Sequence, residues 1–218
     1  MNKRLLVIAT AVLAIGAFAV GAYLYKQTRD AQTTRTAMSS ADLLARPNAP
    51  MLGGESAKVV IVEFLDPACE ACRALAPVVK SLVTASFGQA KLIVRYAPFH
   101  KGSDQAVRIL EAARLQGKYW PVLDAMFESQ SVWAAHDNPR PELIWNFLGA
   151  TGLDIAKAKA DMQDPRITEI LNRDMADVRA LKVTKTPSFF VNGKPLLDFG
   201  PEQLRQLVRS ETRLVYGQ

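Results

Sequence analysis

Cysteine and histidine are scarce in this chain, with two of each among its 218 residues. Cys69 and Cys72 have no other cysteine to pair with, so each can pair only with the other or with a sulfur from another molecule. A structural zinc site needs about four ligands, commonly in two close pairs. His100 and His136 do not make a pair with ligand spacing. The sequence therefore predicts no metal site, and a loop this small removes too little entropy from the unfolded chain to favour a purely structural disulfide.

The chain also lacks a concentrated run of positive charge, although its formal net charge is +6. Residues 1–40 carry five of the 27 basic residues and one of the 21 acidic residues, so the remainder is nearly balanced. Nucleic-acid binding needs a basic stripe or patch on one face. We therefore expect no nucleic-acid partner, and the sequence contains neither an internal repeat nor a sign of an organic cofactor.

The most informative feature that is present is the run Cys-Glu-Ala-Cys at residues 69–72, directly after the apolar run 59–65. A Cys-x-x-Cys pair at a strand-to-helix junction is the arrangement used for thiol–disulfide exchange. If a helix begins at Cys69, unsatisfied backbone N–H groups and the helix dipole favour its thiolate. Cys69 is then the predicted nucleophile, and the more buried Cys72 resolves the mixed disulfide.

An uncharged segment of 21 residues runs from Leu5 to Tyr25. It is long enough to cross a bilayer as a helix, whereas a cleavable signal has a shorter apolar region of about 7–15 residues. We expect residues 1–25 to form an uncleaved signal anchor in the bacterial inner membrane, with the remaining chain in the periplasm. A cleaved signal and a soluble periplasmic protein are the alternative. Either places the cysteines where disulfides persist.

The remaining chain divides into a polar tether and lead-in at 26–57 and a domain at 58–218. We expect a helix from Cys69 to about Phe87, which Pro77 should kink, and further helices between 103 and 181. Asn192-Gly193 is a strong hairpin-turn signal, and a C-terminal helix should follow Pro201. The expected strands are Val59–Leu65, Lys91–Ala97, Ser188–Val191 and a returning strand, Leu196–Phe199.

This order of strands and helices resembles an α/β thioredoxin fold with an inserted helical subdomain at about 101–181, as in DsbA-like thiol:disulfide interchange proteins. The resemblance runs over roughly 58–212. It is carried by Cys69-Glu70-Ala71-Cys72-Arg73-Ala74-Leu75-Ala76-Pro77 and by Thr186-Pro187-Ser188-Phe189-Phe190-Val191-Asn192-Gly193.

The resemblance implies roles for three further residues. Glu63 falls where DsbA-like proteins keep a buried acid, and burial would raise its pKa so that it takes and returns a proton as Cys72 changes state. The alternative is that the strand is offset and Glu63 faces solvent. Thr186-Pro187 matches the cis-proline loop that presents backbone to an extended substrate, and an ordinary trans turn is the alternative.

Three residues around the cysteines should tune the pKa of Cys69. Strongly oxidising DsbA-like proteins often have a histidine just before the second cysteine, where this chain has Ala71. Asp66 and Glu70 place negative charge near Cys69, which opposes its thiolate. We therefore expect a less depressed pKa for Cys69 and a less oxidising disulfide.

The resemblance implies an enzyme, a protein thiol:disulfide oxidoreductase whose only redox group is the Cys69–Cys72 disulfide. It would donate disulfides to exported proteins and be reoxidised by a DsbB-like membrane partner. A reductase or isomerase kept reduced by a DsbD-like partner, similar to suppressor-of-copper-sensitivity proteins and serving cytochrome c maturation or copper-handling proteins, remains open. A third alternative is a non-catalytic module that binds metal through the cysteine pair.

Overall fold

The computed structural model describes residues 3–39 and 41–217, and for residues 3–10, 32–39 and 41 it describes the backbone alone. Met1, Asn2, Ser40 and Gln218, which the expected anchor, tether and domain include, lie outside the described residues. The described strands form a mixed sheet of five in the order β1-β3-β2-β4-β5, in which β2 and β3 are parallel and the other neighbours antiparallel. The strands are β1 Met51–Leu52, β2 Val59–Leu65, β3 Ala90–Tyr96, β4 Ser188–Val191 and β5 Lys194–Pro195.

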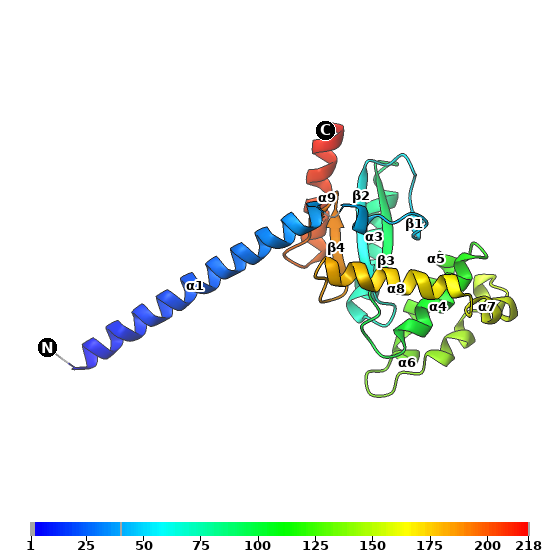
Figure 1. The fold of residues 1–218 in the computed structure, drawn as a ribbon, viewed down its shortest axis with the longest axis horizontal. Coiled ribbons are helices and arrows are strands. Elements are labelled where there is room, and N and C mark those ends of the chain that lie inside the picture. Colours follow the sequence, from blue (N-terminus) through cyan, green and yellow to red (C-terminus); the bar gives the residue numbers. More distant parts are fainter. Residues whose placement is uncertain (1–2, 40, 218) are drawn as a thin grey trace.

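Helices cover both faces of this sheet, and α4 to α7 gather beyond one end of it, while α1 extends away from the domain (Figure 1). The expected helical insertion is therefore present between β3 and β4. The helices are α1 Lys3–Ser39, α2 Ala41–Leu44, α3 Glu70–Thr84, α4 Ser103–Arg114, α5 Tyr119–Glu128, α6 Gln130–Trp133, the 3-10 helices η1 Pro141–Phe147 and η2 Gly149–Thr151, α7 Ile155–Asp161, α8 Pro165–Ala180 and α9 Pro201–Tyr216.

Strand β2 lies in the middle of the sheet, between β3 and β4. Its apolar run is continuous because both of its faces are covered, and successive side chains point to opposite faces. Ile61 and Leu65 join the core that includes α3 and α9, whereas Val62 and Phe64 join the core on the α8 side. Glu63 alternates with Val62 and Phe64, so it shares the α3 face. It is buried there, and the alternative that it faces solvent is wrong.

A buried ionic network fastens α8 to the sheet. The guanidinium of Arg95, on β3, is fully buried and lies 2.7 Å from Asp174 and 2.6 Å from Asp177, both on α8. Arg46 adds a second pair to Asp177 at 2.8 Å. Since buried charges are tolerated only when they are paired and hydrogen-bonded, these four residues set the position of α8 on the sheet.

The amino-terminal predictions need correction. The membrane-spanning helix expected over residues 1–25 is not confirmed, since no helix within the described parts of the chain is long and apolar enough to cross a bilayer. The tether expected from residue 26 is helical as far as Ser39, because residues 26–39 contain no glycine or proline to end α1. The lead-in also holds structure that the sequence did not predict, namely α2 and the short strand β1.

The returning strand of the hairpin was predicted two residues too late. Asn192 and Gly193 have φ of 48° and 80°, the left-handed pair of a two-residue hairpin turn. The strand therefore resumes at once as β5, with Lys194 opposite Val191 and Pro195 opposite Phe190. The residues 196–199, expected as strand, lie beyond it.

Candidate active site

The two cysteines lie at the amino-terminal end of α3. Cys69 caps this helix in an extended conformation, and Cys72 lies in its first turn. The amide of Cys69 donates a hydrogen bond to the carbonyl oxygen of Asp66 at 3.0 Å, which closes the turn between β2 and α3. The structure holds both residues as thiols, with Cys72 fully buried and Cys69 exposed by 7%. The predicted order, an outer Cys69 and an inner Cys72, is therefore the one observed.

The surroundings separate the acidities of the two thiols. A hydrogen bond from the Cys72 side chain does most to lower the pKa of Cys69, whereas burial raises it. Hydrogen bonds from the Thr186 side chain and from the backbone of Cys72 and Ala71 lower it further, and the resulting pKa is about 5. Burial raises the pKa of Cys72 well above its ordinary value, and its hydrogen bond to Cys69 and the charge of Glu63 add to the rise. Cys69 is thus a thiolate at neutral pH while Cys72 keeps its proton.

The loop before β4 reaches the cysteines from the other end of the sequence. The sulfur atom of Cys69 lies 3.3 Å from the carbonyl oxygen of Thr186, to which Cys69 donates a hydrogen bond when it is protonated. The Thr186–Pro187 peptide bond is cis, as expected. Thr186 and Cys69 are brought together because β4 pairs with β2, the strand that leads into the cysteine turn. The loop therefore lies beside the sulfur that a substrate would meet.

Glu63 lies beneath the cysteines on the α3 face of β2. Its side chain is almost fully buried, and its Oε1 atom has no hydrogen-bond partner within the part of the chain that the structure describes. Burial, and then the charge of Cys69, raise the pKa of Glu63 to about 8. A carboxyl group with this pKa can exchange protons near neutral pH, which is the role expected of it.

The residues predicted to tune Cys69 act differently. The carboxylate of Asp66 is fully buried. It accepts hydrogen bonds from the backbone amides of Ala68, Phe99 and His100 and from the hydroxyl group of Ser103. The Nδ1 atom of His100 lies 2.7 Å from it. It organises the loop after β3. Glu70 is exposed and lies 4.0 Å from His136. Neither carboxylate is among the largest influences on the pKa of Cys69, whereas Ala71 contributes through its backbone.

The sequence did not predict Gln130 as a residue that positions the cysteine turn. Gln130, on α6, is buried, and its amide nitrogen donates hydrogen bonds to the carbonyl oxygens of Pro67 at 2.8 Å and Cys69 at 3.1 Å. The helical insertion thereby holds the turn that carries the nucleophile. No sequence pattern signals this contact, because 61 residues separate Gln130 from Cys69.

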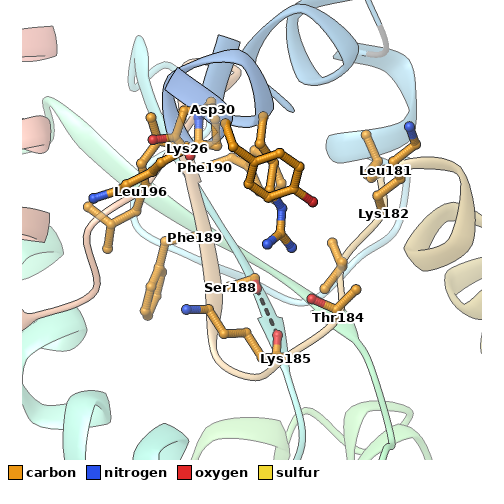
Figure 2. A pocket seen from close by; sticks show the side chains of 15 residues that line it. Lys26, Asp30, Leu181, Lys182, Thr184, Lys185, Ser188, Phe189, Phe190 and Leu196 are labelled. Atoms are coloured by element: carbon orange, nitrogen blue, oxygen red, sulfur yellow. Dashed lines mark hydrogen bonds between the residues drawn. The ribbon is translucent and has the colours of Figure 1, made fainter. Parts of the chain in front are cut away.

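A cavity of about 310 Å³ lies between α1 and the segment that leads into the Thr186-Pro187 loop. Figure 2 shows Lys26 and Asp30 from α1 on one side of it and Lys182, Lys185 and Ser188 on the other. The Ser188 hydroxyl donates to the carbonyl oxygen of Lys185 at 2.7 Å. Neither cysteine lines this cavity, so the sulfur chemistry lies outside it.

The family model described as thioredoxin matches residues 45–210. Among curated proteins, the chain is 36% identical over 145 residues to the Na(+)/H(+) antiporter NhaA of Herminiimonas arsenicoxydans, a match that covers 66% of this chain. It is 29% identical over 177 residues, 77% of this chain, to NhaA 1 of Mycolicibacterium vanbaalenii. The chain spans only 22% and 27% of the lengths of these two relatives.

Solved structures share the fold over nearly their whole length. A thioredoxin-like oxidoreductase from Silicibacter pomeroyi is 31% identical, with a TM-score of 0.67, over 79% of this chain and 96% of that one. The thiol-disulfide exchange protein alpha-DsbA2 from Wolbachia pipientis is 23% identical, with a TM-score of 0.71, over 84% and 97%. BdbD from Bacillus subtilis is 22% identical, with a TM-score of 0.66, over 76% and 93%. The last two are similar in fold alone.

Proposed function

The chain belongs to the thioredoxin family, as a DsbA-like member, and from this premise we propose that it is a thiol–disulfide oxidoreductase that donates disulfides to exported proteins. One observation carries the proposal: the thiol of Cys69, whose pKa is lowered to about 5, contacts Thr186 of the cis-proline loop while Cys72 lies buried behind it. This arrangement leaves one sulfur for a partner and reserves the other for the intramolecular step.

The reaction balances with these residues alone. A substrate thiolate attacks the Cys69 sulfur of the protein disulfide and displaces Cys72 as a thiolate, which takes a proton from Glu63. A second substrate thiolate then attacks the substrate's own sulfur in the mixed disulfide. Cys69 leaves as a thiolate, and two electrons have passed from the substrate to the protein.

The pKa of Cys69, the leaving group of the mixed disulfide, determines the favoured direction of electron flow. A thiol of lower pKa leaves faster and is more stable in the reduced protein, so a depressed pKa for Cys69 favours donation of the disulfide. A pKa of about 5 lies between about 7 for thioredoxin and about 3.5 for DsbA. We therefore propose an oxidant of intermediate strength. This agrees with the expectation of a disulfide less oxidising than that of the strongest DsbA-like oxidants. The charges of Asp66 and Glu70, which led to that expectation, are not the reason.

The place of work and the partners belong to the same proposal. Disulfide donation requires a compartment where disulfides persist, so we propose that the domain works in the periplasm or an equivalent extracytoplasmic space. A membrane oxidant of the DsbB kind would restore the Cys69–Cys72 disulfide there. Thr186 and Pro187 would bind an extended segment of the substrate through backbone hydrogen bonds.

The test is the reduction potential of the Cys69/Cys72 pair, measured on the full chain against a series of glutathione redox buffers. A value of about −120 to −180 mV supports disulfide donation. A value near −270 mV would overturn the direction and favour the reductase alternative. Stoichiometric metal on the purified chain, with no redox cycling, would instead indicate the metal-binding alternative.

A further inference from the structure

A small cavity is lined by the buried Glu63 and by two partly exposed charged residues, Lys80 of α3 and Asp124 of α5. Its volume is about 10 Å³, which is about the space of one water molecule. The rest of its lining is apolar, made of Leu65, Ala76, Val79, Leu92, Val94, Trp120, Leu123 and Phe127.

Lys80 and Asp124, which both line this cavity, form an ion pair. The ammonium group of Lys80 donates a hydrogen bond to Oδ1 of Asp124. Their side chains are 33% and 44% exposed, whereas Glu63 is exposed by only 2%. The charged residues that line the cavity therefore differ in access to bulk water. Because Asp124 comes from the helical insertion, the insertion supplies one of the two that reach solvent.

The chemistry of Glu63 requires an exchange with solvent. With its pKa raised to about 8, Glu63 carries a proton at neutral pH while Cys69 is a thiolate. When Cys69 enters a mixed disulfide, its negative charge disappears, and with it one cause of the raised pKa of Glu63. Glu63 must then release its proton before it can accept the one from Cys72. After it returns that proton to Cys72 in the next disulfide donation, it must regain one from solvent.

Few groups around Glu63 could carry its proton to solvent. Cys69 and Cys72 of α3 are the groups it serves, and Tyr119 of α5 interacts with it electrostatically but is itself fully buried, with its pKa raised. The sheet neighbours Val94 and Phe189, opposite Glu63 on β3 and β4, carry no exchangeable side-chain proton. The unpartnered Oε1 and the cavity towards Lys80 and Asp124 remain.

We propose that a water molecule in this cavity carries the proton between Glu63 and the solvent at the Lys80–Asp124 pair. The proposal rests on the oxidoreductase function above and adds two residues to it. Neither touches the reacting sulfurs, so both are positioning residues that act through Glu63. When the protein is reoxidised, the O–H bond of Glu63 breaks and its proton passes through the water to solvent at Asp124, which leaves a carboxylate to accept the proton of Cys72. When the protein donates its disulfide, Glu63 gives its proton to Cys72, and the same water brings a proton from solvent back to the carboxylate.

The test uses the reduced full chain and glutathione disulfide. Cys69 attacks the probe to give a mixed disulfide and one glutathione; Cys72 then displaces the second glutathione and gives its proton to Glu63. Rapid acid quenching and mass spectrometry follow the decay of the mixed disulfide. The double variant Lys80→Met/Asp124→Leu closes the cavity with apolar groups, and the near-isosteric Asp124→Asn serves if the double variant does not fold. The matched control is Lys157→Met/Asp161→Leu, which changes an ion pair of α7.

The expected result is a decay slowed about tenfold in the double variant, less than the 10²–10⁴-fold that a direct proton acceptor contributes, with the reduction potential and the control unchanged. Added to Glu63→Gln, the double substitution should cause no further loss, because it acts through the same proton. An unchanged decay, or losses that add in full, would overturn the proposal. Failure of the wild-type mixed disulfide to resolve at all would instead count against the proposed function.

Discussion

The thiol of Cys69 donates a hydrogen bond to the carbonyl oxygen of Thr186 at 3.3 Å, although 117 residues separate them in the sequence. The contact joins the start of α3 to the loop before β4, and both follow from the pairing of β2 with β4. Any segment that reaches Cys69 must therefore lie against the backbone of this loop. Under the proposed function, the nucleophile and the backbone that would bind the substrate form one surface.

The two cysteines should behave differently when each is replaced by serine. Cys69→Ser should abolish disulfide exchange, because the remaining thiol, Cys72, is fully buried and keeps its proton. Cys72→Ser should leave a reactive Cys69 that accumulates mixed disulfides, since no thiol is left to resolve them. Mass spectrometry after incubation with glutathione disulfide measures both. Equal adducts on the two variants would contradict the assignment.

Removing the hydroxyl group of Thr186 should weaken the nucleophile. The Thr186 side chain is one of the groups that lower the pKa of Cys69, so Thr186→Val should raise that pKa and make the disulfide less oxidising. The ultraviolet absorbance of the thiolate across a pH titration gives the pKa, and a glutathione series gives the potential. Thr168→Val, on α8, is the matched control. A pKa for Cys69 that is the same in all three proteins would refute the role of this hydroxyl.

Glu63 should make the reduced protein less stable at high pH. Its pKa is about 8 in the folded chain against an ordinary 4.5, so the folded state binds more protons between these values, and stability falls as the pH rises from about 4.5 to about 8. Glu63→Gln removes this loss, and its gain relative to wild type should grow with pH, to at most about 5 kcal/mol. Urea unfolding at pH 5 and pH 9 measures it. A gain independent of pH would show that Glu63 ionises normally.

The buried network of Arg95 should dominate the stability of the sheet. Arg95→Met leaves Asp174 and Asp177 buried without the cation that they share, and breaking such a pair costs about 3–5 kcal/mol. Chemical denaturation of the full chain measures the change. Arg166→Met, which breaks an exposed pair with Asp164, is the control and should change stability little. Similar losses in the two variants would mean that burial of the Arg95 network adds nothing.

Local patterns in the sequence predicted most of the fold. The apolar run of β2, the helix that starts at the cysteines, the left-handed turn at Asn192-Gly193 and the helix after Pro201 all depend on neighbours within a few residues, through side-chain alternation, capping and permitted φ angles. The bounds of β2 and β4 agree with the prediction, those of β3 lie one residue earlier, and α3 begins one residue later and ends about three residues earlier than predicted. The tether and lead-in at 26–57 and the strand β5 were predicted poorly, because polar composition and short strands carry weak local signals.

The sequence by itself determined the reactive pair, because Cys69 and Cys72 need only the first turn of one helix to lie together. The resemblance to DsbA-like proteins also placed Glu63 below them, six residues before Cys69. Only the tertiary structure decided that Asp66 binds the loop after β3, that Gln130 holds the cysteine turn and that Lys80 and Asp124 stand at the cavity of Glu63. The reason is physical: these contacts join residues 33 to 61 positions apart, and what such polar side chains do depends on burial and partners that the packing of the helical insertion alone provides.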